Sequence, residues 1–538
     1  MAEINTKTDV VIVGAGLAGM VAAIELLDLG KKVVLFDRDS KENMGGLARE
    51  SFGGITMIGT PQQRKNSIKD SADLAFNDWI TFGEIPESEI IPRKWIREYV
   101  NRSYEDIYLW LTNRGIKFFP VVHWVERGLF IPGNSVPRFH MVWGTGYYLI
   151  EALKNHLNNH PKKNNLQIFF NHSVENIIFT NGAATGVQVK NEIEKTDFEL
   201  LGEAVVLASG GYCGGSMKML RDNWYKAWGN APEFILNGAH KFADGKMHVV
   251  VKNFGGKITH LDKQWNYAAG VHHPKPKKDL HGLSLVPPKS ALWVNYQGKR
   301  LGPTPLITAF DTRYLVERIT AEKKQYSWQI LNWKIAKKEL AVSGAEYNDA
   351  IKNRNFLAFV KSVLLGNEKL VKDLTTNCKD FVVANSIEEL VKKMNNLTGN
   401  NDVSSELLTS EIRKYDENIG RGKKFHNDDQ LRRITHVREY RGDRVRTCAF
   451  QKIEDKDAMP LIAIREFILA RKSLGGIMTN LESKVLDNNE NPIKGLFAVG
   501  ETAGFGGGGI HGLRSLEGTF LGSCVFTARI AAQAIAKS

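Results

Sequence analysis

The beginning of the chain alternates short apolar runs with glycine-rich turns. Residues 9–13 read Asp-Val-Val-Ile-Val and residues 32–37 read Lys-Val-Val-Leu-Phe-Asp, each with the length of a buried strand. Between them, Leu17 to Leu29 is an apolar stretch of helical length. The pattern predicts a strand, a helix and a second strand in succession, as in a βαβ unit with a parallel sheet.

The turn before this helix reads Gly14-x-Gly16-x-x-Gly19. Gly14 permits a tight turn, Gly16 lets backbone amides approach a pyrophosphate at the positive end of the helix, and Gly19 lets helix and strand pack closely. Asp37 ends the second strand, where a carboxylate accepts hydrogen bonds from a ribose. In this full context the motif predicts a dinucleotide site rather than a purely structural turn. We expect Gly14, Ala15, Gly16 and Gly19 at the pyrophosphate and Asp37 at the adenosine ribose.

Strands followed by glycines return later in the chain. Residues 44–54 form a glycine-rich loop that can bring bare backbone against a large planar ligand. The apolar run at 205–208 ends in Ser209-Gly210-Gly211, and a helical stretch spans 246–253. Near the end, 495–501 is a strand that enters a turn, and 516–535 is an apolar helix. These segments extend the predicted cofactor-binding domain.

The middle of the chain has a different character. Long charged helical patterns run from Thr312 to Lys338 and from Glu388 to Phe425, with few glycines. We therefore predict an α/β fold with a Rossmann-like cofactor-binding domain in two segments, 1–262 and 456–538, and an inserted α+β capping domain at 263–455 that holds the substrate.

The composition of the 538 residues, 43% hydrophobic and 24% charged, is ordinary for a soluble protein. The net charge of +13 comes from scattered lysines without a dense tract or an RNA module, so nucleic acid is not an expected partner. The first strand begins by Asp9 with no preceding basic and apolar segment, and the glycines of the fingerprint argue against a membrane span there. We expect a cytoplasmic protein. Its four widely spaced cysteines predict neither a disulfide nor a metal site.

The ordered motifs resemble those of the fumarate reductase/succinate dehydrogenase flavoprotein superfamily, which includes 3-ketosteroid dehydrogenases. The shared segments are Gly14 to Gly19, the loop 45–54, the strand 205–211 and the strand 495–501. Residues 134–146, 440–444, 471–476 and 508–522 look like a subgroup of FAD-binding dehydrogenases similar to 3-oxosteroid dehydrogenases. The resemblance covers nearly the whole chain and is specific for fold and flavin, and less so for substrate.

The resemblance implies FAD as cofactor and assigns contacts along it. They are Gly45, Gly46, Ser51, Gly53 and Gly54 from the phosphates to the ring, Ala208, Ser209 and Gly210 near the adenosine half, Gly500 and Glu501 at the ribitol, and a helix starting near Ser515 and Leu516 whose positive end faces the flavin. A surface carboxylate is the alternative for Glu501. Superfamily members with covalent FAD use a histidine in the first glycine loop, and Gly46-Leu47-Ala48 contains none. We expect non-covalent FAD, a small-molecule substrate and an unidentified electron donor or acceptor, since no second GxGxxG follows a strand.

Such a flavin site requires a group that moves a proton next to a carbonyl. By resemblance to the carboxylate-reducing members, Arg313 is the candidate acid; the alternative is a helix-face ion pair with Glu317. His511, Tyr212, His140 and Tyr267 are further candidates, although a lone histidine or tyrosine is usually structural.

Two departures argue against a dicarboxylate substrate. No histidine precedes Gly475-Gly476, and Ser515 stands where those enzymes have a substrate-binding arginine, with Arg514 one position earlier. We expect an FAD-dependent oxidoreductase acting on a CH–CH bond next to the carbonyl of a larger ketone, such as a steroid or another polycyclic enone. Aromatic residues between Phe118 and Trp143 line an apolar slot or belong to the core. The alternatives are a fumarate-reductase-like enzyme for a small unsaturated acid, and an RNA-binding flavoprotein.

Overall fold

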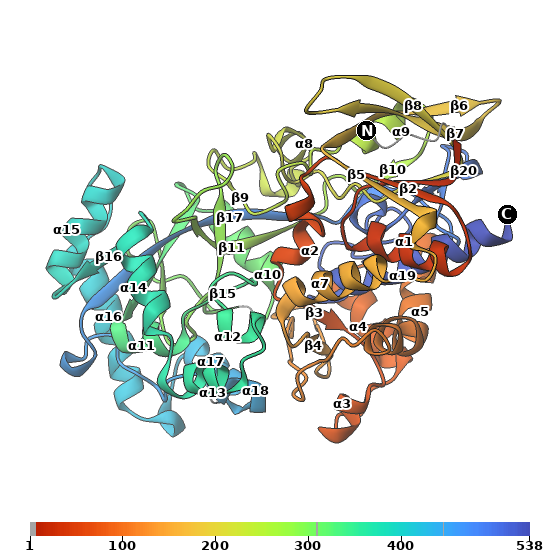
Figure 1. Cartoon of the computed structure of the whole chain (residues 1–538). Helices are drawn as coiled ribbons and strands as arrows, with labels where there is room; N and C mark the ends of the chain where they lie inside the picture. Colours follow the sequence, from red (N-terminus) through yellow and green to blue (C-terminus); the bar gives the residue numbers. More distant parts are fainter. Residues whose placement is uncertain (1–6, 308–309, 445) are drawn as a thin grey trace.

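Two eight-stranded sheets form two lobes that lie side by side (Figure 1). The computed structural model of the protein describes residues 7–307, 310–444 and 446–538. One lobe carries the strands from the beginning of the chain together with its last helix. The other is built largely from the middle of the chain.

The first sheet has the strand order β19-β20-β8-β1-β2-β5. Its strands are β1 (Lys7–Val13), β2 (Val33–Asp37), β5 (Leu166–Phe170), β8 (Asp197–Leu207), β19 (Lys484–Leu486) and β20 (Pro492–Ala498), with the hairpin of β6 (His172–Thr180) and β7 (Ala183–Asn191) attached to β8. β1 pairs in parallel with β2 and β8, and β20 pairs in parallel with β8. The carboxyl ends of β1, β8 and β20 therefore meet at one edge.

Helices pack against this sheet and against one another. They include α1 (Leu17–Asp28), α4 (Ala72–Phe82), α5 (Ile90–Ser103), α7 (Thr145–Asn158) and α19 (Thr519–Lys537), whose side chains share one hydrophobic core. The predicted strand, helix and strand at the beginning of the chain are confirmed. By length and composition α19 is able to cross a membrane, but 72% of its most apolar window is buried inside the protein.

The second sheet has the order β13-β14-β17-β11-β12-β15, and β9 and β16 pair with β17. Its strands are β9 (Leu236–Asn237), β11 (Gln264–His272), β12 (Gly282–Val286), β13 (Leu292–Asn295), β14 (Tyr326–Asn332), β15 (Ala341–Val342), β16 (Phe381–Ala384) and β17 (Leu461–Ser473). β17 is the centre of this sheet because it bonds to four other strands. The sequence-based domain limits place β17 with the cofactor domain; those limits stay a prediction.

The continuous helical pattern expected at 312–338 is wrong. Helices α10 (Thr312–Thr320) and α11 (Trp333–Glu339) flank β14, every residue of which is buried. Pairing with β17 on one side and β13 on the other overrides the charged helical character of the flanks. The second pattern likewise divides into α15 (Ile387–Thr398) and α16 (Ser405–Gly420), because Gly399 ends α15 in a left-handed conformation.

Shorter elements connect the lobes and border the site. They are α2 (Gly46–Glu50), β3 (Gly54–Thr56), α3 (Pro61–Lys65), α6 (Trp110–Thr112), β4 (Phe139–Met141), α8 (Lys218–Asp222), α9 (Lys246–Asn253), β10 (Ile258–Thr259), α12 (Asp349–Lys352), α13 (Phe356–Leu365), α14 (Glu368–Asn377), α17 (Asp429–Glu439), α18 (Arg441–Arg444) and β18 (Gly476–Ile477). The helix predicted at 246–253 is confirmed as α9.

Candidate functional site

A cavity of about 1820 Å³ is lined by residues of both lobes. Val13 and Ala208 reach it from the ends of β1 and β8, and Tyr267 and Lys472 reach it from β11 and β17. A pocket for one small ligand measures about 300–1,000 Å³. This cavity therefore has room for a large cofactor together with a substrate.

The glycine turn after β1 forms part of the cavity wall. A Cβ atom on Gly14, whose φ is +106°, would lie 2.4 Å from the carbonyl oxygen of Ala208, and one on Gly19 would lie 1.9 Å from the carbonyl oxygen of Gly14. Gly16 differs, because a Cβ there would meet no atom within 4 Å. Gly16 is also the N-cap of α1, and no side chain caps the helix. Open space beside uncapped backbone N–H groups is the arrangement that a pyrophosphate fits.

Asp37 lies on the cavity wall at the end of β2. Its carboxylate accepts hydrogen bonds from the backbone N–H of Ala15 at 2.6 Å and of Asp39 at 2.7 Å. Burial raises the pKa of this carboxyl, and the two backbone hydrogen bonds oppose the shift. Asp37 thus holds the glycine turn in place through Ala15. It also lies where the sequence predicts a contact with the ribose.

The structure brings together most of the residues predicted to contact the cofactor. Those that line the cavity are Gly14, Gly16, Asp37, Gly45, Gly46, Ser51, Gly53, Gly54, Ala208, Ser209, Gly210 and Glu501. Those outside the lining are Ala15, Gly19, Gly500, Ser515 and Leu516. Loops far apart in the chain therefore form one wall, and their individual contacts with a cofactor stay predictions.

Glu501 is a partly buried link between the two lobes. One of its carboxylate oxygens accepts hydrogen bonds from the backbone N–H of Ser473 at 2.9 Å and from the hydroxyl of the same residue at 3.0 Å. Burial raises the pKa of Glu501. The alternative of a surface carboxylate is wrong, because the side chain joins the end of β17 to the turn after β20.

The apolar helix near the end of the chain begins later than predicted. α19 starts at Thr519, and Gly518 caps it with a left-handed φ of +97°. The left-handed conformation of Gly518 prevents the helix from starting earlier. Ser515 and Leu516 therefore lie in the preceding turn, where both are buried. Gly518, Phe520 and Leu521 line the cavity, so the positive end of α19 lies at its wall.

Arg514 does not replace the arginine missing at position 515. Its guanidinium donates to Asp311 at 2.8 Å and to Glu84 at 2.5 Å, and it is not among the residues that line the cavity. The hydroxyl of Ser515 lies 3.2 Å from that of Thr519. No arginine stands at the start of α19 in the position that the dicarboxylate enzymes use, as the shift of one residue predicts.

Aromatic side chains form a second wall of the cavity. The residues are Phe118, Phe119, Trp124, Phe139 and Trp143, joined by Phe359 from α13. The rings of Phe119 and Trp143 meet edge to face with centroids 4.9 Å apart. This arrangement matches the predicted apolar slot, which suits a flat hydrophobic ligand.

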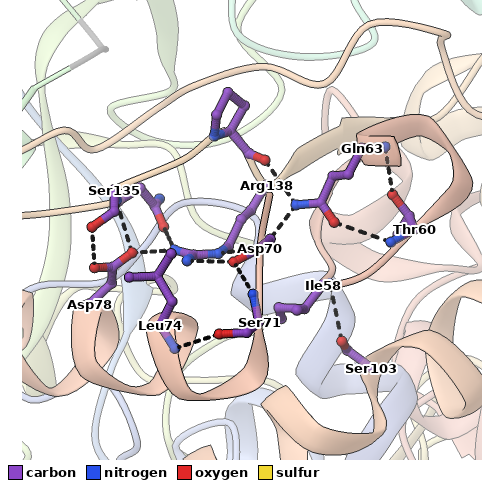
Figure 2. Close-up of polar contacts among 12 residues, drawn as sticks. Ile58, Thr60, Gln63, Asp70, Ser71, Leu74, Asp78, Ser103, Ser135 and Arg138 are labelled. Atoms are coloured by element: carbon purple, nitrogen blue, oxygen red, sulfur yellow. Dashed lines mark hydrogen bonds and ion pairs between the residues drawn. The ribbon is translucent and has the colours of Figure 1, made fainter. Parts of the chain in front are cut away.

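A buried polar network holds this wall in place (Figure 2). Arg138 donates to the carboxylate of Asp70 at 2.8 and 2.9 Å and to that of Asp78 at 2.5 Å, and its side chain is 1% exposed. Asp78 also accepts from the hydroxyl of Ser135 at 2.6 Å. The network fixes the segment that enters β4, whose Phe139 lines the cavity.

Two of the predicted proton-transfer residues are fully used in structural contacts. His140 bonds through one ring nitrogen to the hydroxyl of Thr60 and through the other to the carbonyl of Arg138, each at 2.7 Å. Burial lowers its pKa to about 4. The hydroxyl of Tyr212 donates to the carbonyl of Leu261 at 2.9 Å. Neither residue lines the cavity.

His511 and Arg313 also lie outside the cavity lining. The ring of His511 stacks on Trp79 with centroids 5.5 Å apart, and burial lowers its pKa to about 3. The guanidinium of Arg313 lies 4.3 Å from the ring centre of Tyr225 and 4.2 Å from that of Trp228. In the described part of the chain Arg313 forms no ion pair with Glu317, so that alternative is wrong; its guanidinium donates instead to the backbone carbonyl of Leu513 at 3.4 Å. The proton-transfer role of Arg313 stays a prediction without a contact that supports it.

The cavity instead contains a cluster that centres on Tyr267. Lys472 donates to the Tyr267 hydroxyl oxygen at 2.9 Å, and that hydroxyl donates to Glu517 at 3.1 Å. Glu517 also accepts from the indole N–H of Trp265 at 3.0 Å and lies 3.4 Å from Lys472. Burial raises the pKa of Tyr267 well above its usual value and lowers that of Lys472. Sequence reasoning named Tyr267 but missed Lys472 and Glu517; a lysine near the end of an apolar strand was the available signal.

Glu126 adds a second acid to this cavity. The side chain is buried at the cavity wall and accepts from the hydroxyl of Thr312 at 2.7 Å. Burial raises its pKa well above the usual value, and the negative charge of Glu517 adds to the shift. Its backbone φ of +51° is unusual for a non-glycine residue. Burial thus favours the protonated form of this carboxyl.

The sequence profile of the family described as FAD binding domain matches residues 9–521. The chain belongs to this family. A KsdD-like steroid dehydrogenase of Mycobacterium tuberculosis is 38% identical over 549 aligned positions, which cover 98% of this chain and 96% of the relative. FAD as cofactor, the flavoprotein fold with a capping lobe, and the resemblance to ketosteroid dehydrogenases and fumarate reductases are confirmed.

Two solved structures show the same fold. A 3-ketosteroid delta1-dehydrogenase from Sterolibacterium denitrificans, in complex with 1,4-androstadiene-3,17-dione, superposes with a TM-score of 0.71 at 16% identity and covers 99% of this chain and 100% of that one. A flavocytochrome c3 fumarate reductase superposes with a TM-score of 0.70 at 20% identity, over 100% of this chain and 79% of that one. The fold is thus shared by both groups and does not choose between them.

Proposed function

We propose that this protein is an FAD-dependent oxidoreductase that acts on a CH–CH bond next to the carbonyl of a polycyclic ketone, such as a 3-ketosteroid. The observation that carries the proposal is the shared cavity. It combines the glycine loops of an FAD domain, an aromatic wall and the Tyr267 cluster. The similarity to KsdD-like steroid dehydrogenases over nearly the full length supports the substrate class.

The residues present fit FAD, and we propose that they hold it without a covalent bond. The open space beside Gly16 and the start of α1 suit the pyrophosphate, and the start of α19 suits the negative charge of a reduced flavin. When bound, FAD supplies the acceptor or donor of a hydride. The first glycine loop offers Gly46-Leu47-Ala48 and no histidine for a covalent attachment.

We assign the handling of the proton to the Tyr267 cluster. A phenol with a raised pKa keeps its proton at neutral pH, and on substrate binding this single proton would turn from Glu517 to the substrate carbonyl. Lys472 and Glu517 orient that hydroxyl, and Glu517, which lines the same cavity, would take up the proton released next to the carbonyl. Glu126, whose pKa burial raises, is a second carboxyl group in the same cavity.

The alternative within the superfamily is the reduction of a small unsaturated acid. The dicarboxylate enzymes bind carboxylates with an arginine at the start of the last helix, where this chain has the buried Ser515. Arg514 is already paired with Asp311 and Glu84. We therefore favour the larger ketone.

We propose a separate electron donor or acceptor and a cytoplasmic location; fractionation of cells tests the location.

The experiment that tests the function is anaerobic. The bound flavin is photoreduced, and a panel of polycyclic enones and of unsaturated acids is added while its absorption is followed. We expect 3-oxo steroids with a ring double bond to restore the oxidised spectrum, and fumarate to do so poorly. Rapid reoxidation by fumarate and none by the ketones would contradict the proposal.

A further inference from the structure

One wall of the cavity carries two cations, and a third cation lies outside the lining and contacts the same acid. Lys289, Arg446 and Asp443 line the cavity, and the buried Arg127 pairs with Asp443. Lys289 forms an ion pair with Asp443, and Arg127 donates to the same carboxylate at 3.3 Å. The single negative charge of Asp443 is thus shared by Lys289 and Arg127, and Arg446 adds a third positive charge.

The other acid in this wall is already occupied. Glu339 accepts from the backbone N–H and the hydroxyl of Ser290 at 2.8 and 2.7 Å, from the backbone N–H of Cys448 at 2.6 Å and from Arg438 at 3.4 Å. Arg446 reaches only the backbone carbonyl oxygen of Glu339, at 3.4 Å, among the described residues. The cluster of Lys289, Arg127, Arg446 and Asp443 therefore keeps an excess of positive charge.

One donor atom of this cluster has no hydrogen-bond acceptor among the described residues. The Nη1 atom of Arg127 is buried without a hydrogen-bond acceptor in the described part of the chain, and the side chain is 4% exposed. The guanidinium is held over the rings of Trp124, at 4.4 Å, and Tyr440, at 5.4 Å. Burial lowers the pKa of Lys289, and the nearby charge of Arg446 adds to the shift. Burying an uncompensated cation is costly unless a ligand supplies the negative charge.

We propose that Lys289 and Arg446 form an anion subsite that binds a carboxylate on the side chain of the ketone substrate, and that the buried charge of Arg127 beside Asp443 adds to its positive potential. This inference rests on the proposed function and narrows its substrate class to polycyclic ketones that carry an acidic side chain. Arginine and lysine together bind a carboxylate through charge-assisted hydrogen bonds. The aromatic ring of Trp124, which also lines the cavity, lies beside the subsite and would contact the apolar part of the same ligand.

Calorimetry on the FAD-loaded protein tests the subsite with two matched ligands. One is a 3-oxo-4-ene steroid whose side chain ends in a carboxylic acid, and the other is its methyl ester. We expect the acid to bind about tenfold more tightly than the ester, and Arg446→Met to remove about tenfold of the affinity for the acid while leaving the ester unchanged. Lys289→Met should act in the same direction. Lys372→Met, which removes an exposed cation from the same cavity lining, is the control and should change neither.

A second probe separates this inference from the proposed function. Cholate carries the side-chain carboxylate but no ketone, so its binding does not depend on the reaction. Weaker binding of cholate to Arg446→Met than to the parent protein supports the subsite even if no ketone reoxidises the flavin. Equal affinities for acid and ester in the parent protein, or cholate binding that ignores Arg446, would overturn it.

Discussion

The ammonium group of Lys472 lies 2.9 Å from the hydroxyl oxygen of Tyr267, and both residues line the cavity. Lys472 also lies 4.0 Å from the ring centre of Phe520, at the start of α19. The cation therefore connects the proton-bearing phenol to the helix end predicted to face the flavin. In the proposed reaction, a positive charge at this place would stabilise negative charge that develops on a substrate oxygen.

Replacing Tyr267 with phenylalanine removes the hydroxyl at the centre of this cluster. We expect Tyr267→Phe to keep FAD and to lose about 10²–10⁴-fold in turnover, the usual contribution of a positioned acid or base. Tyr212→Phe is the matched control, because the Tyr212 hydroxyl bonds to the backbone outside the cavity. Steady-state kinetics with a ketone from the flavin assay measures both variants. The assignment fails if Tyr212→Phe is the slower enzyme.

Arg313 provides a contrasting test. If it were the acid, as its resemblance to the carboxylate reducers implies, Arg313→Ala would lose about a hundredfold or more in turnover. Its position against Tyr225 and Trp228 leads us to expect less than a tenfold loss, together with a lower Tm, because cation–π contacts are worth about 0.5–2 kcal/mol. A large loss of turnover with unchanged Tm would restore the catalytic role.

A side chain at Gly16 should fill the space that the pyrophosphate needs. We expect Gly16→Val to weaken FAD binding about tenfold or more, since its side chain projects into the cavity beside the start of α1. Gly420→Val is the control, because a Cβ there meets only the end of the Lys452 side chain, at 3.5 Å. The ratio of flavin absorption to protein absorption gives the result. Normal FAD content in Gly16→Val would be incompatible with the proposed pyrophosphate position.

Fumarate should be a poor oxidant of the reduced protein, because Ser515 replaces the carboxylate-binding arginine. Restoring that arginine is not expected to raise the rate of fumarate reduction. Ser515 is fully buried beside His511 and Thr519, so Ser515→Arg introduces a buried charge and should destabilise the fold by about 3–5 kcal/mol. Denaturant unfolding and fumarate kinetics on the same preparation check both points. A stable Ser515→Arg protein with fast fumarate turnover would contradict this description of the turn.

The network of Figure 2 predicts a strong effect on stability. Arg138→Met leaves Asp70 and Asp78 buried without their cation and should cost about 3–5 kcal/mol. Arg97→Met removes an equally short but exposed ion pair with Asp73 and should cost no more than about 1 kcal/mol. Urea unfolding measures both free energies. Similar values for the two variants would mean that the network does not stabilise the aromatic wall.

The nucleotide side of the site was predictable because its signal is local. Gly14, Gly16 and Asp37 lie within one βαβ unit, and each is required by a turn, a close contact or a strand end that neighbouring residues already define. The substrate side has no such signal. Tyr267 and Lys472 are 205 positions apart and meet only because β11 pairs with β17. A single sequence does not reveal that pairing.

The same limit explains the errors. β14 was read as part of a helix because its strand character comes from burial between β13 and β17 and not from its own alternation of polar and apolar residues. His511 and Tyr212 were candidates by residue type alone. Their contacts with Trp79 and with the carbonyl of Leu261 depend on tertiary packing.

β17 has a consequence for how this protein can be taken apart. Its first residues pair with β14 and β16 inside the capping lobe, and its last ones, Lys472 and Ser473, bond to Tyr267 and Glu501. The capping lobe therefore cannot be removed or exchanged as an independent unit. A deletion or graft that ends before Leu461 leaves the second sheet without its central strand, and one that ends after Ser473 removes Lys472 from the candidate site. Recombination between relatives must therefore exchange this strand together with β14 and β16 at its beginning and with Tyr267 and Glu501 at its end.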